Sequence, residues 1–401
     1  MTGTRAAPPA RWRRLPGAGL GGARVALLGC GLLVNVGTFA VYPYLALLLR
    51  ERLGAGMAEV GVVLGAATLV QFASAPFTAS FAERVGLKRS LVVASVLYLL
   101  GAVAYLTGTL TVLGLFLGCG AGALYSPAYR GYLAQSATEE QRPRAVAAGS
   151  AASNLGVAFG PVVGAVFLAD PGRLFTLTTA LYSVLAVGHL LLRPEPPGRH
   201  ATTVEPFRRA LRGLAVVPFA VTALTHYLYM QYYHYLSAFS EGRLPTAAYA
   251  AIMTGYALGM AVAQPLVARW ASRVGYRNAM AFGFAAMALG MVAVAGGRPV
   301  TVAVGAAAMC AGTAVLFLKN DLEALAGSTR SATVTFGQQR LAVGVGALFS
   351  GAIGGSAYGL FERADLLPGF WLAVAAQCVL LPVPVVLAAR RAVTTSASRR
   401  R

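Results

Sequence analysis

Residues 225–237, THYLYMQYYHYLS, place five tyrosines, two histidines and a glutamine between almost wholly apolar neighbours. On a helix, residues three or four apart face the same side. Two adjacent stripes result, one of His226, Tyr229 and Tyr233 and one of Tyr227, Gln231 and His234. An imidazole exchanges a proton near neutral pH, and phenol and amide groups hydrogen-bond to a solute. The segment could therefore bind a polar solute and move protons, provided that it lines a space reached by water. Tyr232, Tyr233 and Tyr235 could instead form an aromatic belt at a membrane surface.

A few other ionisable groups interrupt apolar runs. Arg130 and Arg340 are the basic ones, and Gln338 lies two residues before Arg340. Because an ionisable group at membrane depth is costly, each is a candidate functional residue, although Arg130 could extend to the membrane surface instead. After His226, the candidate proton carriers are Glu59, Asp321 and Glu323, of which Glu59 could be merely interfacial. No Asp or Glu falls near the middle of an apolar run, which favours neutral, zwitterionic or anionic organic solutes.

Motifs of other chemistry are missing from the chain. It has no paired carboxylates and no nucleophile motif, so an enzyme is the least favoured class. His226 and His234 are eight residues apart, which is not the spacing of a zinc pair. The four cysteines, Cys30, Cys119, Cys310 and Cys378, are far apart inside apolar runs, as packing residues would be. We expect no metal and no cofactor.

The elements that must position these residues are membrane-spanning helices. The chain has 401 residues, of which 57% are hydrophobic and 11% charged, whereas soluble domains are about a quarter charged. Crossing a bilayer takes roughly 20 helical residues, and the alternation of a closed barrel is absent. Apolar runs predict twelve spans, which start near residues 25, 57, 90, 110, 145, 174, 211, 246, 278, 299, 331 and 367.

Basic residues gather on one side of these spans. The segments on the side of the N-terminus hold 25 Lys and Arg, and those on the opposite side hold six. By the positive-inside rule both termini are cytoplasmic, and the net charge of +20 reflects topology and lipid contact, not nucleic acid. The expected organisation is a basic tail (1–24), six helices (25–192), a linker (193–210), six helices (211–390) and a basic tail (391–401).

The two sets of six helices are related in sequence. Glu83-Arg84-Val85-Gly86-Leu87-Lys88 is echoed 189 residues later by Ser272-Arg273-Val274-Gly275-Tyr276-Arg277, and the same offset relates Arg130 to Lys319. Tyr42-Pro43-Tyr44-Leu45 has a counterpart 191 residues later in Tyr233-His234-Tyr235-Leu236. Internal repeats are typical of transporters. A duplicated unit would make Asn35 and Tyr42 face the same space as His226 and Tyr229.

Residues 79–89, ASFAERVGLKR, resemble the loop between helices 2 and 3 of the major facilitator superfamily, whose pattern is Gly-x-Leu-Ala-Asp-Arg-x-Gly-Arg-Lys. Ala79, Glu83 and Leu87 depart from that pattern. The resemblance implies a cytoplasmic gate in which Glu83 pairs with Arg142 or Arg144 near the start of helix 5, although Glu83 could be a solvated loop charge. The expected gate residues are Glu83, Arg84, Gly86, Lys88, Arg89, Arg142, Arg144, Arg273, Gly275 and Arg277.

Residues 154–164, NLGVAFGPVVG, are similar to the Gly-x-x-x-Gly-Pro-x-x-Gly motif of helix 5 in that superfamily, where the motif is associated with drug:proton antiporters. Its members here are Asn154, Gly156, Gly160, Pro161 and Gly164. Glycines four residues apart let a second helix approach closely. One departure concerns the patch Gly118 to Gly122 in span 4, which follows Leu115, Phe116 and Leu117 where the antiporters usually carry an Arg.

The sequence predicts an all-α integral membrane fold of twelve transmembrane helices in two pseudo-symmetric halves, the major facilitator fold. The resemblance implies a monomeric secondary transporter of a bacterial plasma membrane, which exports a small organic molecule, a drug or secondary metabolite, by proton antiport with alternating access. An uptake symporter for a neutral or anionic metabolite is the first alternative, and a non-transporting receptor the second. The expected cavity residues are Asn35, Tyr42, Arg130, His226, Tyr229, Gln231, Tyr233, Gln338 and Arg340.

Overall fold

The computed structural model describes residues 18–136, 142–192, 212–328 and 332–384, and all regular structure in them is helical. The first group of helices, here the N group, consists of α1 Ala18–Val41, the short η1 Tyr42–Tyr44, α2 Leu45–Leu53, α3 Met57–Ala73, α4 Ala75–Val85, α5 Leu87–Thr107, α6 Thr111–Gln135, α7 Arg142–Phe167 and α8 Pro171–Leu190. The second, the C group, consists of α10 Val216–Ser240, α11 Thr246–Arg273, α12 Tyr276–Ala295, α13 Pro299–Gly327, α14 Ala332–Phe349, η2 Ser350–Gly354, α15 Gly355–Arg363 and α16 Leu367–Leu380.

Local sequence sets where several helices begin and break. Gly86, with φ of 103°, turns the chain from α4 directly into α5, a conformation that costs glycine little. Asp170 caps α8 by accepting a hydrogen bond from the Arg173 amide, and Pro171 supplies the first turn. Pro43 lies in η1 between α1 and α2, and the turn at Ser74 separates α3 from α4. The helices begin close to the span starts that the sequence predicts. The sequence did not predict the interruptions at Pro43 and Ser74.

Within the described residues, nine helical stretches are long and apolar enough to cross a membrane. The shorter apolar helix α3 continues as α4 after the break at Ser74. Large apolar side chains such as Val166, Leu266 and Val300 are about 70% exposed on the helix surfaces. Such surfaces suit lipid and not water.

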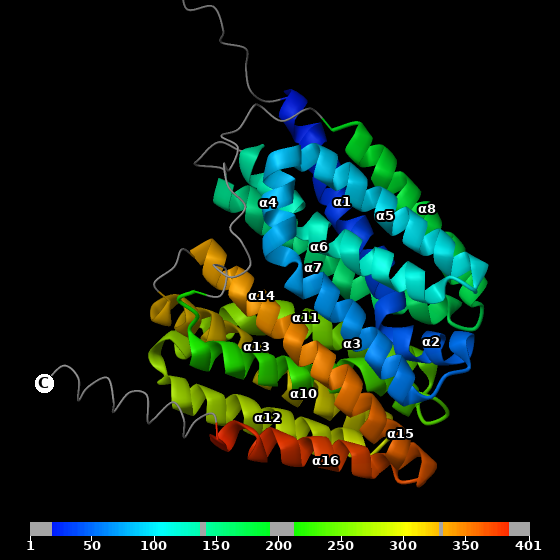
Figure 1. Ribbon diagram of the computed structural model, residues 1–401, viewed down its shortest axis with the longest axis vertical. Helices are drawn as coiled ribbons and strands as arrows, with labels where there is room; N and C mark the ends of the chain where they lie inside the picture. The colour runs from blue at the N-terminus through cyan, green and yellow to red at the C-terminus, as the bar shows by residue number, and fades with distance from the viewer. Residues whose placement is uncertain (1–17, 137–141, 193–211, 329–331, 385–401) are drawn as a thin grey trace, which may run out of the picture.

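Corresponding helices of the two groups have corresponding neighbours. In the N group α1 packs against α7 and α8, α5 against α6 and α8, and α3 against α6. In the C group α10 packs against α14 and α16, α12 against α13 and α16, and α11 against α13. The groups meet where α3 runs beside α14 and α15, and where α7 meets α11 (Figure 1).

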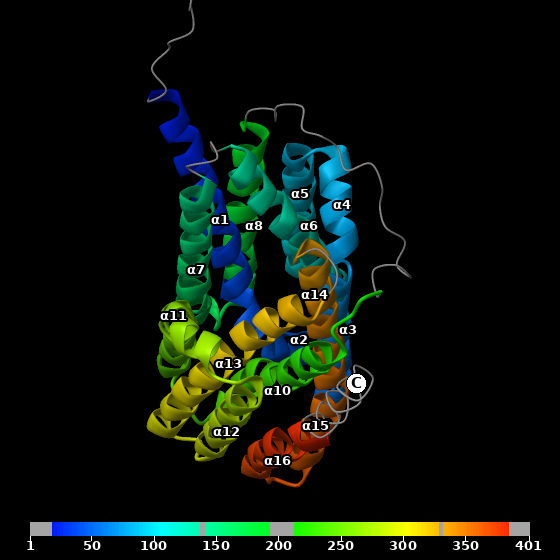
Figure 2. The same ribbon diagram turned by 90° about the vertical axis from the view of Figure 1, so that its left-hand side faces the viewer.

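The two groups touch more closely at one end. We call the end with α2, η1 and α15 the distal end, and the end at which α1 begins and α4 finishes the proximal end. α10 contacts both η1 and α2, and α3 contacts η2 and α15, all at the distal end. Figure 2 shows the N group upright, with α10, α12 and α13 at a wide angle to it. The predicted tails and the linker 193–210 lie almost entirely outside the described residues, although α1 starts seven residues before the predicted boundary.

Candidate functional site

A cavity of about 1220 Å³ lies between the N and C groups. Residues of α1, α3 to α8, α10 and α14 line it. Eight of the nine predicted cavity residues are among them: Asn35, Tyr42, Arg130, His226, Tyr229, Tyr233, Gln338 and Arg340. The structure thus brings together residues that are separated by up to three hundred positions in the chain.

Gln231 is the predicted residue that lies elsewhere. Its side chain is buried, and its Nε2 is 3.4 Å from Oε1 of Gln377 on α16. Tyr227, one turn earlier, donates a hydrogen bond to the same Gln377 oxygen at 2.6 Å. The stripe of Tyr227 and Gln231 therefore faces the interior of the C group, whereas the stripe of His226, Tyr229 and Tyr233 faces the cavity.

Tyrosines from both groups form the distal floor of the cavity. The rings of Tyr42 on η1 and Tyr233 on α10 lie 5.6 Å apart, and Tyr229 is 5.7 Å from Tyr233. The Tyr42 hydroxyl is 3.2 Å from the hydroxyl of Thr68. Because Tyr42 and Tyr233 belong to the two related sequence segments, these segments meet where the groups meet. An aromatic surface with hydroxyl groups suits a solute with an aromatic or apolar body.

His226 is held in one orientation on the cavity wall. Its Nδ1 is 2.9 Å from the Thr222 carbonyl oxygen, and its ring stacks on Phe317 with the centroids 4.6 Å apart. A carbonyl can only accept, so Nδ1 carries the hydrogen. Nε2 then holds the lone pair and is the nitrogen that can take up a proton.

Two guanidinium groups reach the cavity, one from each group. Arg130 projects from α6 and Arg340 from α14, and both are exposed in the gap between the groups. The Arg340 guanidinium carbon lies 5.5 Å from the ring centroid of Phe72 on α3. Neither arginine has a carboxylate within 4.0 Å among the described residues. No Asp or Glu of the described chain lines the cavity.

The sequence did not single out several polar cavity residues of the N group. Tyr98 and Tyr182 stack with their ring centroids 4.9 Å apart, and the Tyr182 hydroxyl is 3.2 Å from that of Thr38. Gln71 on α3 also lines the cavity. Each is a single polar group within an apolar run, unlike His226 in its polar stretch. This feature could have identified them, but only with knowledge of which helix face they occupy.

The other candidate proton carriers lie away from the cavity lining. Glu59 is exposed in the first turn of α3 at the distal end. Asp321 and Glu323 are half-buried near the end of α13. Of the cavity-lining residues, His226 is the one that carries an imidazole, the side chain most often used as a proton carrier.

The predicted gate residues lie at the proximal turns. Arg84 and Arg89 are exposed on either side of Gly86, and Lys88 is half-buried. Arg273, Gly275 and Arg277 are exposed at the turn between α11 and α12. The side chains of Glu83, Arg142 and Arg144 lie outside the described part, so the predicted pairing between them stays a prediction.

The glycine motif of α7 faces α1. A Cβ at Gly160 would lie 2.5 Å from Cβ of Phe39 and 2.9 Å from the Ala40 nitrogen. A Cβ at Gly156 would lie 2.7 Å from Cβ of Asn35, and one at Gly164 would overlap the Ala40 carbonyl. The absence of these side chains lets α7 press against the helix that carries Asn35 to the cavity, while Asn154 itself lines the cavity.

Five buried residues from both groups close the distal end; we call Pro43, Tyr44, Tyr249, Gly61 and Gly351 the distal seal. The Tyr249 hydroxyl of α11 donates to the Pro43 carbonyl of η1 at 2.8 Å, and the Tyr44 and Tyr249 rings are 5.2 Å apart. A Cβ at Gly351 would overlap the Gly61 carbonyl oxygen. These contacts join the N and C groups beyond the tyrosine floor.

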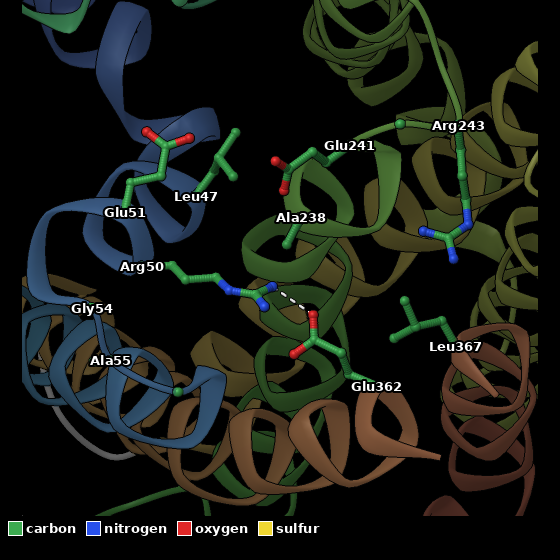
Figure 3. Close-up of a pocket in the computed structure, with 12 residues that line it drawn as sticks. Leu47, Arg50, Glu51, Gly54, Ala55, Ala238, Glu241, Arg243, Glu362 and Leu367 are labelled. Carbon is green, nitrogen blue, oxygen red and sulfur yellow. Dashed lines mark hydrogen bonds and ion pairs between the residues drawn. The ribbon is translucent and has the colours of Figure 1, made fainter. Parts of the chain in front are cut away.

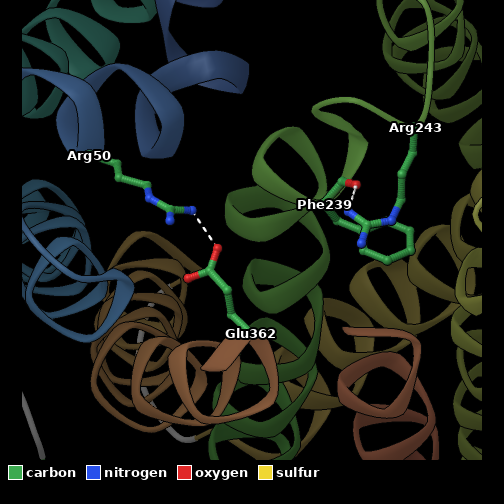
Figure 4. A network of polar contacts seen from close by, with 4 residues as sticks. All are labelled: Arg50, Phe239, Arg243 and Glu362. Carbon is green, nitrogen blue, oxygen red and sulfur yellow. Dashed lines mark hydrogen bonds and ion pairs between the residues drawn. The ribbon is translucent and has the colours of Figure 1, made fainter. Parts of the chain in front are cut away.

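A second, charged pocket of about 800 Å³ opens on the distal side (Figure 3). Arg50 of α2 points across it to Glu362 of α15, with a nitrogen–oxygen distance of 2.5 Å. Arg243 lies over the Phe239 ring and donates to the Phe239 carbonyl at 3.0 Å (Figure 4). The Arg50–Glu362 ion pair is therefore a further bond between the groups on the closed side.

Comparison with known proteins identifies the family. Residues 27–244, more than half of the chain, match the sequence profile described as Major Facilitator Superfamily. The chain belongs to this superfamily. It is a multi-pass membrane transporter and not an enzyme.

Two bacterial transporters and a solved structure are similar to this major facilitator chain. An uncharacterized MFS-type transporter of Mycobacterium tuberculosis is 28% identical over 83% of this chain and 85% of its own. A Na⁺, Li⁺, K⁺/H⁺ antiporter of Planococcus maritimus is 34% identical over 40% of this chain and 39% of its own. The crystal structure of the nucleoside transporter NupG, at 13% identity, matches with a TM-score of 0.79 over 91% of this chain and 99% of its own. The last match concerns the fold alone.

Proposed function

We propose that the protein is a secondary transporter that exports a small organic molecule by proton antiport. One observation carries the proposal: a large cavity lies between two helix groups that are joined by the distal seal and diverge toward the proximal end. A site that opens to one side at a time is the requirement of alternating access. The described conformation is then the one open at the proximal side.

The two groups act as pseudo-symmetric halves of six transmembrane helices each. The matching neighbours within the groups support this assignment, with α1 to α8 and α10 to α16 supplying one half each. The excess of Lys and Arg at the proximal turns and tails makes that side cytoplasmic. The protein then lies in the bacterial plasma membrane as a monomer with both termini in the cytoplasm.

Proton antiport is favoured by the cavity and by one relative. His226 lines the cavity with its ring fixed by Thr222 and Phe317, and its Nε2 is the nitrogen left to take up a proton. The Planococcus maritimus relative is named as an antiporter of monovalent cations and protons, although the match covers 40% of this chain. Glu83, with Arg142 or Arg144, would close the cytoplasmic side when the distal seal opens. Glu59, Asp321 and Glu323 are secondary carriers.

Inverted membrane vesicles test both the transport and its direction. Their lumen corresponds to the outside of the cell and is acidified before a panel of neutral, anionic and cationic organic compounds is added outside. Export by antiport predicts that at least one compound releases luminal protons in wild-type vesicles and not in vesicles that lack the protein. If no member of a broad panel moves protons in either direction, the antiport proposal is wrong and the non-transporting receptor is the favoured alternative.

The uptake symporter remains the second candidate because of the cavity charge. Two guanidinium groups without a lining carboxylate resemble a site that collects an anion together with a proton. Span 4 also lacks an Arg before Gly118, where drug:proton antiporters usually carry one. In inverted vesicles a symporter would carry protons inward with an external compound, so the sign of the pH change distinguishes the two directions.

A further inference from the structure

We propose that the cavity selects organic anions with an aromatic or apolar body, and that such an anion bridges Arg130 and Arg340 across the two groups. This inference names the substrate class of the site and rests on the proposed transport function. The charge of the lining, the geometry of Arg340 and the aromatic floor each support it.

The first step is the charge of the lining. Arg130 and Arg340 are the charged side chains that line the cavity in the described residues. Lys319, the counterpart of Arg130 in the sequence repeat, does not reach it: Lys319 is 8% exposed, and its Nζ donates to the Ala271 carbonyl at 3.1 Å. Asp321 interacts electrostatically with Arg340 from α13, but it lies beyond 4.0 Å and outside the lining. The cavity is therefore cationic, and a cationic solute would be repelled.

The second step is the geometry of Arg340. Its guanidinium packs against Phe72 of the opposite group, which fixes the cation without using its N–H groups. No described residue accepts a hydrogen bond from Arg340 or from Arg130. A guanidinium presents up to five donors in a planar fork that matches a carboxylate, phosphate or sulfonate. Two such forks without protein acceptors are suited to an anionic group.

The third step is the arrangement of the two arginines across the groups. Arg130 belongs to the N group and Arg340 to the C group, and because both line the same cavity their like charges repel each other. Closing the proximal side moves the groups together and strengthens that repulsion. An anion bound between the arginines removes it, so a loaded carrier closes more readily than an empty one. This property would couple substrate binding to the conformational change.

The fourth step is the body of the solute. Tyr42, Tyr229 and Tyr233 form a floor of aromatic rings beyond the arginines, and further rings, such as Tyr98 and Tyr182, line the N group. An inorganic anion would leave this surface without a partner. An amphipathic organic anion satisfies both the guanidinium forks and the rings.

Binding to the purified full-length protein in lipid nanodiscs tests the proposal with three matched probes. These are 4-phenylbutyrate, the neutral 4-phenylbutanol and the cationic 4-phenylbutylamine, with inorganic phosphate as a headgroup without a body. We expect 4-phenylbutyrate to bind and the other three to bind at least about tenfold more weakly. The alcohol and the amine lose the charge-assisted hydrogen bonds to the arginines, and phosphate loses the contacts with the aromatic rings. Equal or tighter binding of the amine would refute the preference for anions. Equal binding of phosphate would refute the requirement for an aromatic or apolar body.

Variants assign the binding to the two arginines. Arg340→Gln and Arg130→Gln should each weaken 4-phenylbutyrate binding by about ten- to a hundredfold. Arg340→Lys keeps the charge but not the fork, so we expect intermediate binding. Arg363→Gln, an exposed arginine at the distal end outside the cavity lining, is the matched control and should bind as wild type does. Unchanged binding by well-folded Arg340→Gln and Arg130→Gln would refute the site.

Proteoliposomes separate this inference from the proposed transport. Exchange of radiolabelled 4-phenylbutyrate against internal 4-phenylbutyrate should exceed its net release into an empty medium, because the empty carrier closes slowly. Binding of the anion without any proton movement would support the substrate class and refute the antiport. Proton-coupled transport of amines alone would support the antiport and refute the substrate class.

Discussion

His226 lines the cavity, and one of its ring nitrogens, Nδ1, is engaged by the protein. Since Nδ1 donates to the Thr222 carbonyl and Phe317 fixes the ring plane, replacement by Gln keeps much of the volume but removes the imidazole, the proposed proton carrier. We expect His226→Gln to abolish compound-dependent proton release in inverted vesicles, down to the level of vesicles without the protein.

A second histidine provides the control for this prediction. His189 is fully buried in the N group, where its Nδ1 is 2.7 Å from the Ser95 hydroxyl, and it does not line the cavity. His189→Gln should leave proton release intact in protein that still folds. Full proton release by His226→Gln would assign the proton to another carrier, with Asp321, Glu323 and Glu59 next to be tested.

The Arg50–Glu362 pair links the two groups on the distal side. Its side chains are 38% and 28% exposed, so solvent screening leaves the pair worth about 0.2–1 kcal/mol. Glu362→Gln should therefore raise the ratio of distal-open to distal-closed protein by about one and a half- to fivefold. Double electron–electron resonance between spin labels at positions 53 and 366 measures that ratio, because both leucines are exposed at the distal end.

Salt provides an independent check on the same pair. An exposed ion pair weakens as ionic strength rises, so high salt should increase the distal-open fraction of wild type more than that of Glu362→Gln. An equal salt response in both proteins would mean that the pair does not contribute to closure.

At the scale of the helices, the α7 motif depends on close approach to α1. Gly160→Ala would place a Cβ 2.5 Å from Phe39 and 2.9 Å from a backbone nitrogen, so α1 or α7 must shift. Overpacking of this kind costs about 1–3 kcal/mol. We expect a lower midpoint of thermal unfolding in detergent and weaker substrate binding, because α1 carries Asn35 into the cavity.

Gly255→Ala on α11 is the matched control for Gly160→Ala. No atom lies within 4 Å of the position that its Cβ would take, and alanine favours a helix by about 1 kcal/mol over glycine. Its unfolding midpoint should equal or exceed that of the wild type. If both substitutions behave alike, close packing of the α7 stripe does not limit stability.

The sequence was more informative about where helices begin than about which way they face. Apolar runs bounded by charges or by Gly and Pro are local signals, so the start of α3 at Met57 and of α13 at Pro299 could be predicted. The direction of Gln231 depends on Gln377 of α16, 146 residues later, and no local pattern reveals that partner. The break at Ser74 and the π-helical turn at Gly351 also lie within runs that look continuous in the sequence.

For the whole molecule, the distal seal brings the backbones of the two groups into direct contact. Across it, α3 and the segment from η2 to α15 approach so closely that no side chain fits at Gly61 or Gly351, and a Cβ at Gly355 would lie 2.6 Å from the Met57 carbonyl oxygen. Backbone contacts of this kind form only when the two groups are together on the distal side. In the alternating access that we propose, these contacts stabilise the distal-closed state and must break when the distal side opens.

Gly351→Val is the strongest test of that role. Its side chain would meet the Gly61 carbonyl, which belongs to the other group and cannot yield as a flexible side chain would. Since overpacking costs about 1–3 kcal/mol, and this cost arises only in the distal-closed state, the ratio of distal-closed to distal-open protein should fall by about five- to a hundredfold. Spin labels at positions 53 and 366 should then report longer distances. Gly359→Ala, on the adjoining helix α15, would place its Cβ 3.9 Å from the nearest atom and should retain the wild-type distances. Wild-type distances in both variants would mean that closure on the distal side does not depend on the glycine contact. Other contacts between the two groups would then have to keep the distal side closed.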